Sequence, residues 1–173
     1  MPRINLNADL GEGYGPWTMG DDATMLAIVN SANVACGGHA GDPDVMRRTL
    51  RLAREHGVSI GAHPSYPDLR NFGRRAMSLA PAELENQLAA QIGALIGIAA
   101  MEGIRVSHVK PHGALNNQAC VDRALADTIC RTVRAIDPAL ILLAPAASQL
   151  VAAGHAAGLT VVEEIFADRA YLP

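Results

Sequence analysis

The sequence predicts one α/β domain over residues 1–173, with helices packed against a parallel sheet. Three observations predict it. Short β-like runs alternate with helical patterns along the chain. Half of the 173 residues are hydrophobic, which is enough for a sizeable core. No internal repeat or linker divides the chain. Periodicity does not distinguish an open doubly wound sheet from a closed β/α barrel, so both architectures remain open at this point.

The elements follow in order. Strands are expected at residues 4–10, 33–35, 58–62, 106–109, 140–144 and 160–165. Asp42-Pro43 is typical of an N-cap followed by Pro at the first helical position. Gly57 and Gly103 stand where left-handed C-caps are expected. Pro81 opens a long helix whose apolar residues repeat at helical spacing, and Ser148 is expected to cap the last helix.

Charge and composition exclude several classes of partner. Fourteen Lys and Arg against seventeen Asp and Glu leave a net charge of −3 without a basic block, which argues against nucleic acid and anionic membranes. No apolar run reaches the ~18 residues of a membrane span. The first residues do not have the pattern of a signal peptide. Three widely spaced cysteines without a CxxC motif predict free thiols in a reducing cytoplasm.

Reactive side chains follow the predicted strands. In parallel α/β folds, ligands bind beyond the carboxyl ends of the strands. In chain order, the candidates are Asp9, Glu12, His39, His63, Lys110, His112, Asp168 and Arg169. We therefore expect these residues to line one cleft. His56 and His155 lie near helix C-termini, where a cation suits the helix dipole, and His108 is expected to be buried in a strand.

Such a cluster can bind a divalent metal or act as general acid and base, and the sequence does not decide between these roles. Asp9 and Glu12 are expected to push each other's proton affinities apart. Lys110 is expected to act as a base or oxyanion stabiliser, or to form a salt bridge. Asp42 is expected to serve as an N-cap, and Cys36 is a weaker candidate near the site.

Two further features could contact a ligand. Gly37 and Gly38 would let backbone N–H groups approach an anion, although a tight turn needs the same residues. The irregular stretch 64–79 is long enough to be functional, and it carries Arg70, Arg74 and Arg75. These arginines would either clamp a carboxylate or remain surface charges. Motifs for nucleotide-phosphate loops, dinucleotide binding and acyl-enzyme chemistry do not stand out.

Six blocks, read in order, resemble the LamB/YcsF family, which supplies one component of 5-oxoprolinase. They are NLNADLGE (5–12), ACGGHAGD (35–42), GAHPSYPD (61–68), FGRR (72–75), VKPHGAL (109–115) and FADRAY (166–171). The resemblance implies a seven-stranded TIM-like β/α barrel of the glycoside hydrolase/deacetylase superfamily. It also implies ATP-dependent opening of 5-oxoproline to L-glutamate, together with partner subunits B and C that would bind the ATP.

Combined with the strand-end argument, the resemblance suggests two sets of site residues. The catalytic set is Asp9, Glu12, His39, His63, Lys110 and His112, and the substrate-binding set is Gly37, Gly38, Arg74, Asp168 and Arg169. The alternatives are a metal-dependent deacetylase-like hydrolase and a non-catalytic substrate-binding subunit. The chain departs from the family in carrying Asn116-Asn117 where Tyr-Asn is usual. It also stops soon after Arg169 although family members are longer, so we expect a barrel without its closing strand.

Overall fold

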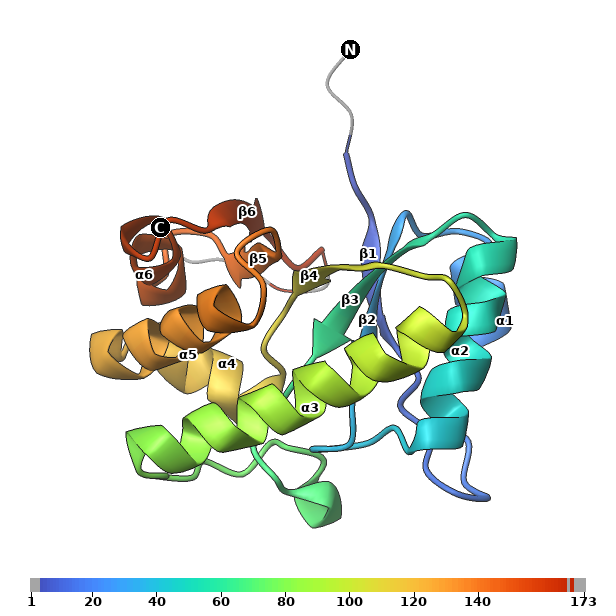
Figure 1. Ribbon diagram of the computed structural model, residues 1–173, viewed down its shortest axis with the longest axis horizontal. Helices are drawn as coiled ribbons and strands as arrows, with labels where there is room; N and C mark the ends of the chain where they lie inside the picture. The colour runs from blue at the N-terminus through green and yellow to red at the C-terminus, as the bar shows by residue number, and fades with distance from the viewer. Residues whose placement is uncertain (1–3, 168, 170–173) are drawn as a thin grey trace.

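The computed structural model describes residues 4–167 and 169, and its centre is a parallel sheet (Figure 1). The six strands are β1 (Asn7–Leu10), β2 (Ser31–Ala35), β3 (Ser59–His63), β4 (Val106–Val109), β5 (Ile141–Pro145) and β6 (Thr160–Glu164). Each strand pairs in parallel with the next along the chain, in the order β1-β2-β3-β4-β5-β6. All six predicted strands are confirmed, with ends shifted by a few residues.

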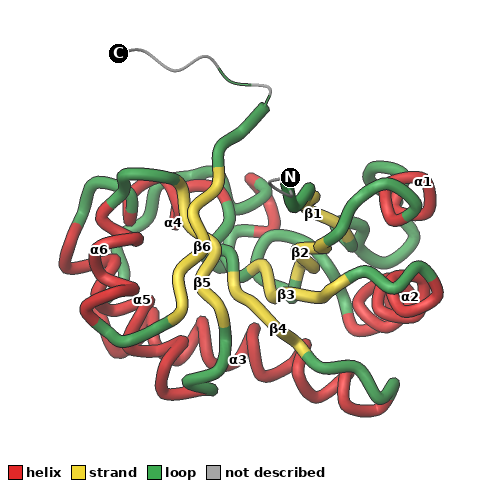
Figure 2. The backbone as a smooth tube through the Cα atoms, turned by 90° about the horizontal axis from the view of Figure 1, so that it is seen from above, coloured by secondary structure: helices red, strands yellow, loops and turns green. Residues whose placement is uncertain are grey.

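This strand order decides the architecture that periodicity left open. A doubly wound sheet reverses its strand order at a switch point, whereas here the order is sequential throughout. The sheet curls, and the helices lie around its outer side (Figure 2). Within residues 4–167 and 169, no backbone pairing joins β6 to β1. The described chain is therefore an open half-barrel, and the seven-stranded barrel implied by the resemblance is not confirmed.

The helix ends that the sequence predicts are confirmed. They are α1 (Asp22–Leu26), α2 (Pro43–Glu55), α3 (Pro81–Met101), α4 (Gly113–Ala119), α5 (Arg123–Ile136) and α6 (Gln149–Ala156). Asp42 caps α2 by accepting hydrogen bonds from the N–H groups of Asp44 and Val45, and Ser148 caps α6. Gly57 and Gly103 have φ of 67° and 66°, the left-handed conformation expected after α2 and α3.

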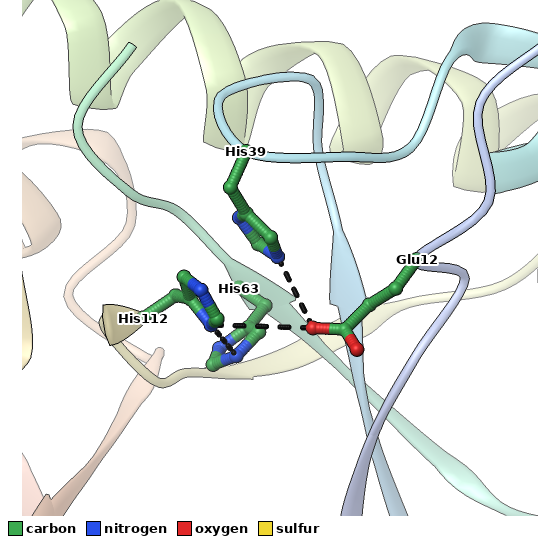
Figure 3. A group of neighbouring side chains, drawn as sticks. All are labelled: Glu12, His39, His63 and His112. Carbon is green, nitrogen blue, oxygen red and sulfur yellow. Dashed lines mark hydrogen bonds and ion pairs between the residues drawn. The ribbon is translucent and has the colours of Figure 1, made fainter. Parts of the chain in front are cut away.

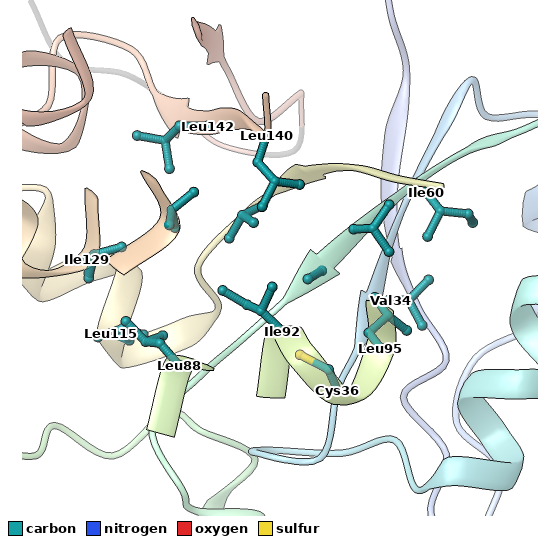
Figure 4. Close-up of a cluster of buried hydrophobic side chains, with 14 of the residues drawn as sticks. Val34, Cys36, Ile60, Leu88, Ile92, Leu95, Leu115, Ile129, Leu140 and Leu142 are labelled. Atoms are coloured by element: carbon teal, nitrogen blue, oxygen red, sulfur yellow. The ribbon is translucent and has the colours of Figure 1, made fainter. Parts of the chain in front are cut away.

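The outer face of the sheet forms the hydrophobic core against the helices (Figure 4). Because side chains alternate along a strand, Val34, Ile60 and Leu142 point to this face and are fully or almost fully buried. Helix α3 meets them with Leu88, Ile92 and Leu95, which lie at helical spacing. Few aromatic residues are available, so the core consists mainly of aliphatic side chains that let helices approach the sheet closely.

The inner face of the sheet is polar. The residues that alternate with the core positions are Asn7, Asp9, Asn33, His63, His108 and Glu164, and Lys110 follows directly after β4. Most of them are buried despite their polarity. Burying polar groups is costly unless they are hydrogen-bonded or paired, so this face needs a connected network. The curl of the sheet concentrates the predicted site residues on its concave side.

Helices α2 and α3 are tied together by a cluster of charges. Glu102, directly after α3, pairs with Arg47 and with Arg51 of α2, the latter at 3.0 Å. Hydrogen bonds from Arg51 and Arg47 lower the pKa of Glu102 to about 2. A carboxyl whose pKa falls on folding stabilises the native state above its ordinary pKa of 4.5, and this contribution is lost as pH falls towards 2.

We therefore expect Glu102→Gln to lower the midpoint of thermal unfolding at pH 7 and to have a smaller effect at pH 3. Thermal unfolding followed by circular dichroism at both pH values measures this difference. Glu55→Gln, at the exposed end of α2, is the matched control and should change little at either pH. An equal loss for Glu102→Gln at pH 3 and pH 7 would contradict an electrostatic origin.

The loop 64–79 contains only one short element, η1 (Leu69–Asn71), and runs across the end of the sheet. It is anchored rather than free. Ser65 and Tyr66 are buried, and the side chain of Gln91 bonds both the N–H and the C=O of Ser65. No helix within residues 4–167 and 169 has the length and apolarity needed to cross a membrane.

Candidate active site

Three charged side chains meet at the carboxyl end of the inner face. Lys110 Nζ lies 3.1 Å from Asp9 Oδ1 and 3.3 Å from Glu164 Oε2. It also donates to Asn7 Oδ1 at 3.2 Å. Lys110 and Glu164 are buried, and Asp9 is partly exposed to the cavity. Lys110 thus forms salt bridges with both carboxylates, and it places a positive charge at the floor of the site.

Asp9 is held in place on both oxygens. Oδ1 accepts from Lys110 and from Asn33 Nδ2, and Oδ2 lies 3.2 Å from His63 Nε2. Burial by itself would raise the pKa of Asp9. The opposing effects of His63, Lys110 and Asn33 outweigh burial and lower the pKa well below its ordinary value. Asp9 is thus ionised at neutral pH.

Three histidines lie together (Figure 3), and one of them, His63, contacts Asp9. His63 comes from the end of β3, His112 from the start of α4, and His39 from the loop between β2 and α2. The rings of His39 and His112 stack with centroids 3.7 Å apart, and His63 meets both edge-on. His63 Nε2 lies 3.0 Å from His112 Nδ1. The three strand-end histidines thus lie together, and two of them, His63 and His112, line the same cavity.

Glu12 completes this group. Its Oε1 lies 3.2 Å from His39 Nε2 and 4.0 Å from His112 Nδ1. Burial raises the pKa of Glu12, and the charge of Asp9 contributes to this increase. Burial lowers the pKa of His39 and of His112 to about 3. The pKa values of Asp9 and Glu12 are thus shifted in opposite directions, as the sequence predicts for neighbouring carboxylates.

One donor atom from each of Glu12, His39, His63 and His112 lies within 4.8 Å of all the others. Carboxylate oxygens and imidazole nitrogens are ligands of divalent transition metals. The residues are thus of the right type and closeness to hold such an ion.

A second layer of polar side chains, which was not predicted from the sequence, supports the site. Asn33 donates to Asp9 and to Asn7, and its Oδ1 accepts from His108 Nε2 at 3.0 Å. His108 is buried, as expected, but it also positions Asn33. Its ring fills the space that a side chain at Gly61 would need. The available signal was the spacing of Asn7 and Asp9, two residues apart on one strand face, together with an Asn inside an apolar strand.

A cavity of about 160 Å³ opens above these groups. Its lining includes Asp9, His63, Lys110, His112, Asn116, Asn117, Phe166 and two arginines, Arg74 and Arg169. The guanidinium of Arg169 stacks on Phe166 with 4.0 Å to the ring centroid, and that of Arg74 lies over Phe72 at 5.5 Å. Two cations at the rim and one at the floor suit an anionic small molecule.

Other predicted residues lie elsewhere or have structural roles. Asp168 lies outside the described residues. Gly37 has φ of 98° and forms a turn, with its N–H bonded to the C=O of Ala40. A Cβ at Gly38 would lie 2.5 Å from Ser65 Oγ, so packing alone requires glycine there. Among the described residues that line the cavity, which include Asp9 and Arg74, neither Gly37 nor Gly38 is found.

The remaining expectations concern residues away from the cavity. Arg75 lies 3.7 Å from Asp68, and Arg70 borders a separate groove. Cys36 belongs to the hydrophobic core, and burial raises the pKa of its thiol to about 12. It is therefore not a nucleophile. All three cysteines are free, as predicted.

The family model described as "LamB/YcsF family" matches residues 4–173. The chain belongs to the LamB/YcsF family. Two relatives, from Azoarcus sp. and Methylococcus capsulatus, are each named as the A subunit of 5-oxoprolinase. They are 66% and 60% identical over 99% and 98% of this chain. The chain covers 67% and 65% of those two proteins, about two thirds of their length.

A solved structure shows the same arrangement. The lactam utilization protein from Thermus thermophilus superimposes with a TM-score of 0.97 at 46% identity. The match covers 99% of this chain and 69% of that protein. The curled sheet and the loops that carry the site thus have the arrangement of an experimentally determined relative.

Proposed function

We propose that this LamB/YcsF chain works as the A subunit of 5-oxoprolinase and opens the lactam ring of 5-oxoproline to give L-glutamate. The observation that carries the proposal is the cavity in which an ionised carboxylate, a buried lysine and exposed arginines converge. The names of relatives at 60% and 66% identity support the substrate class. They favour lactam hydrolysis over the deacetylase and the non-catalytic alternatives.

The substrate carries one carboxylate and one cyclic amide, and the cavity offers a partner for each. Arg74 and Arg169 at the rim bind the carboxylate. Because Arg169 is stacked on Phe166, its guanidinium is pre-oriented and less side-chain entropy is lost on binding. The lactam then lies towards the floor, next to Asp9 and Lys110.

The chemistry requires water to attack the amide carbon and a proton to reach the ring nitrogen. Asp9 is ionised, so it orients the water and accepts its proton as the water attacks. Lys110 places a fixed positive charge beside the oxygen on which negative charge develops. His112, in contact with His63, lies next to the route by which a proton returns to the leaving nitrogen.

ATP and the partner subunits complete the reaction. The lactam is a stable amide, and phosphorylation of its oxygen by ATP would activate the ring carbon towards water. The C–N bond then breaks as the nitrogen takes up a proton, which leaves an acyl phosphate, and hydrolysis of that acyl phosphate gives glutamate and phosphate. We assign this step, and ATP binding, to partner subunits B and C in a cytoplasmic complex. The relatives are named as one lettered subunit of 5-oxoprolinase, which supports an assembly of several subunits.

The opening between β1 and β6 is where a further strand would close the sheet into a seven-stranded barrel.

The proposal is tested by combining this chain with the two partner subunits, 5-oxoproline and ATP, and measuring glutamate. We expect glutamate formation to depend on all three proteins. Glutamate formation that continues at the same rate without this chain would contradict the proposal, as would a complete assembly that forms none.

Arg74→Gln should raise the KM for 5-oxoproline by roughly 10-fold or more, since a charge-assisted pair contributes about 1.5–3 kcal/mol. The effect on kcat should be smaller, because Arg74 lies at the rim rather than beside the lactam. Arg105→Gln is the control, because Arg105 is exposed and lies just before β4, at the amino ends of the strands and away from the cavity. Equal KM values for the two variants would remove Arg74 from the substrate site.

A further inference from the structure

The tautomers of two histidines follow from their backbone partners. His63 Nδ1 lies 2.7 Å from the C=O of Lys110, and His112 Nε2 lies 2.9 Å from the C=O of Phe72. A carbonyl oxygen only accepts hydrogen bonds, so each of these nitrogens carries its hydrogen. In the neutral rings, the other two nitrogens, His63 Nε2 and His112 Nδ1, therefore present lone pairs.

These two lone pairs face each other across 3.0 Å. Asp9 Oδ2 brings a further electron-rich atom to 3.2 Å from His63 Nε2, and Glu12 Oε1 lies 4.0 Å from His112 Nδ1. Acceptors at such distances repel one another unless a positive centre lies among them. A proton on His63 Nε2 can bond Asp9 or His112, but its effect is confined to that ring and its nearest acceptor.

We propose that Glu12, His39, His63 and His112 bind one divalent transition-metal ion of the Zn²⁺ type. Zinc bonds to nitrogen and oxygen are about 2.0–2.2 Å long, so tetrahedral ligand atoms lie roughly 3.4 Å apart. The separations of 3.0, 3.2 and 4.0 Å in this cluster lie on both sides of that value. Imidazole-rich sets with one carboxylate suit zinc and its neighbours rather than magnesium or calcium.

The surroundings hold the ligands in position before any ion binds. Backbone carbonyls orient His63 and His112, which is the usual way in which outer groups fix metal-binding histidines. His39 stacks flat on His112 at an interplanar angle of 8°, and Phe72 packs edge-on against both rings. Glu12 reaches the cluster from the turn after β1, so ligands come from four separate segments.

This site borders the cavity of the proposed function, because His63 and His112 belong to both. A bound ion of this kind supplies Lewis-acid polarisation of a carbonyl oxygen and lowers the pKa of water. The catalytic role of the ion rests on the proposed function, whereas the binding of the ion does not, because binding is measured without substrate.

The test is a calorimetric titration of the chelator-treated 173-residue chain with Zn²⁺, and a parallel titration with Co²⁺ followed by visible absorption. We expect one ion per chain and a visible absorption spectrum typical of tetrahedral Co²⁺. Glu12→Gln and His39→Gln should each weaken binding by at least about 10-fold. His155→Gln, which changes a histidine of α6 outside the cluster, should bind like the unchanged chain. Far-UV circular dichroism checks that each variant is folded.

Two results would overturn the inference. One is the absence of stoichiometric binding to the folded chain, which would mean that a proton on His63 serves the cluster. The other is Zn²⁺ binding to Glu12→Gln that is as tight as binding to the unchanged chain. Glu12→Gln keeps the shape of the side chain, so it tests the site even if His39→Gln does not fold. Zinc binding without glutamate formation would support the metal site and contradict the proposed function. Glutamate formation without zinc binding would support the proposed function and contradict the metal site.

Discussion

Lys110→Met is expected to destabilise the protein by roughly 3–5 kcal/mol, the cost of removing one partner from a buried ion pair. Lys110 neutralises Asp9 and Glu164 at 3.1 and 3.3 Å, and both Lys110 and Glu164 are buried. Without the ammonium group, two carboxylates would face each other with little access to water. Urea unfolding at pH 7 measures the loss of stability, and glutamate formation should also be lost.

A double variant separates charge from packing. Lys110→Met with Glu164→Gln removes the lysine and one of its carboxylate partners, so it should be considerably more stable than Lys110→Met alone. Glu164→Gln by itself leaves Lys110 paired with Asp9 and should cost less. If the double variant were as unstable as the sum of the single variants, the loss would come from packing rather than from unpaired charge.

Gly41→Ala is expected to destabilise the protein by roughly 3 kcal/mol, from backbone strain and overpacking together. Gly41 has φ of 78°, a conformation that an L-residue adopts at a cost of about 1–2 kcal/mol. A Cβ there would lie 2.8 Å from the backbone carbon of Ala35 and closer still to its oxygen. Since backbone atoms cannot rotate away, the loop must shift, and this loop carries His39. For a chain of this length, the midpoint of thermal unfolding should fall by about 6–12 °C.

Gly93→Ala is the matched control for this substitution. Gly93 lies on the exposed side of α3, and a Cβ there meets nothing within 4 Å. The same added methyl group should stabilise the protein by about 0.5–1 kcal/mol, because alanine favours a helix more than glycine does. Similar losses for Gly41→Ala and Gly93→Ala would show that the conformation of Gly41 is not the cause.

Much of the fold could be predicted because its signals are local. Strand positions follow from short apolar runs, and the caps at Asp42 and Ser148 follow from side chains that bond the nearest free N–H groups. The convergence of His39, His63 and His112 follows from the rule that parallel strands point the same way. Each of these predictions depends on a few neighbouring residues or on strand direction alone.

Other features depend on which strands become neighbours. Asn33 reaches Asp9 and His108 only because β2 pairs with β1 and the sheet curls. Lys110 and Glu164 are far apart in the sequence, yet they form a buried pair. Gly38 resembles part of an anion-binding loop, but its close neighbours are Ser65 and Gln91 from elsewhere in the chain. Sequence spacing contains no information on such contacts.

The sequence by itself determined the α/β class, the order of the elements and the residues that stand at the strand ends, because periodicity and capping act over a few positions. Only the tertiary structure decided that the sheet is curled, that Lys110 is an ion-paired cation, and that the pKa is lowered at Asp9 and raised at Glu12. These properties arise from burial and from charges brought close by the curl of the sheet. They therefore exist only once distant segments have packed together.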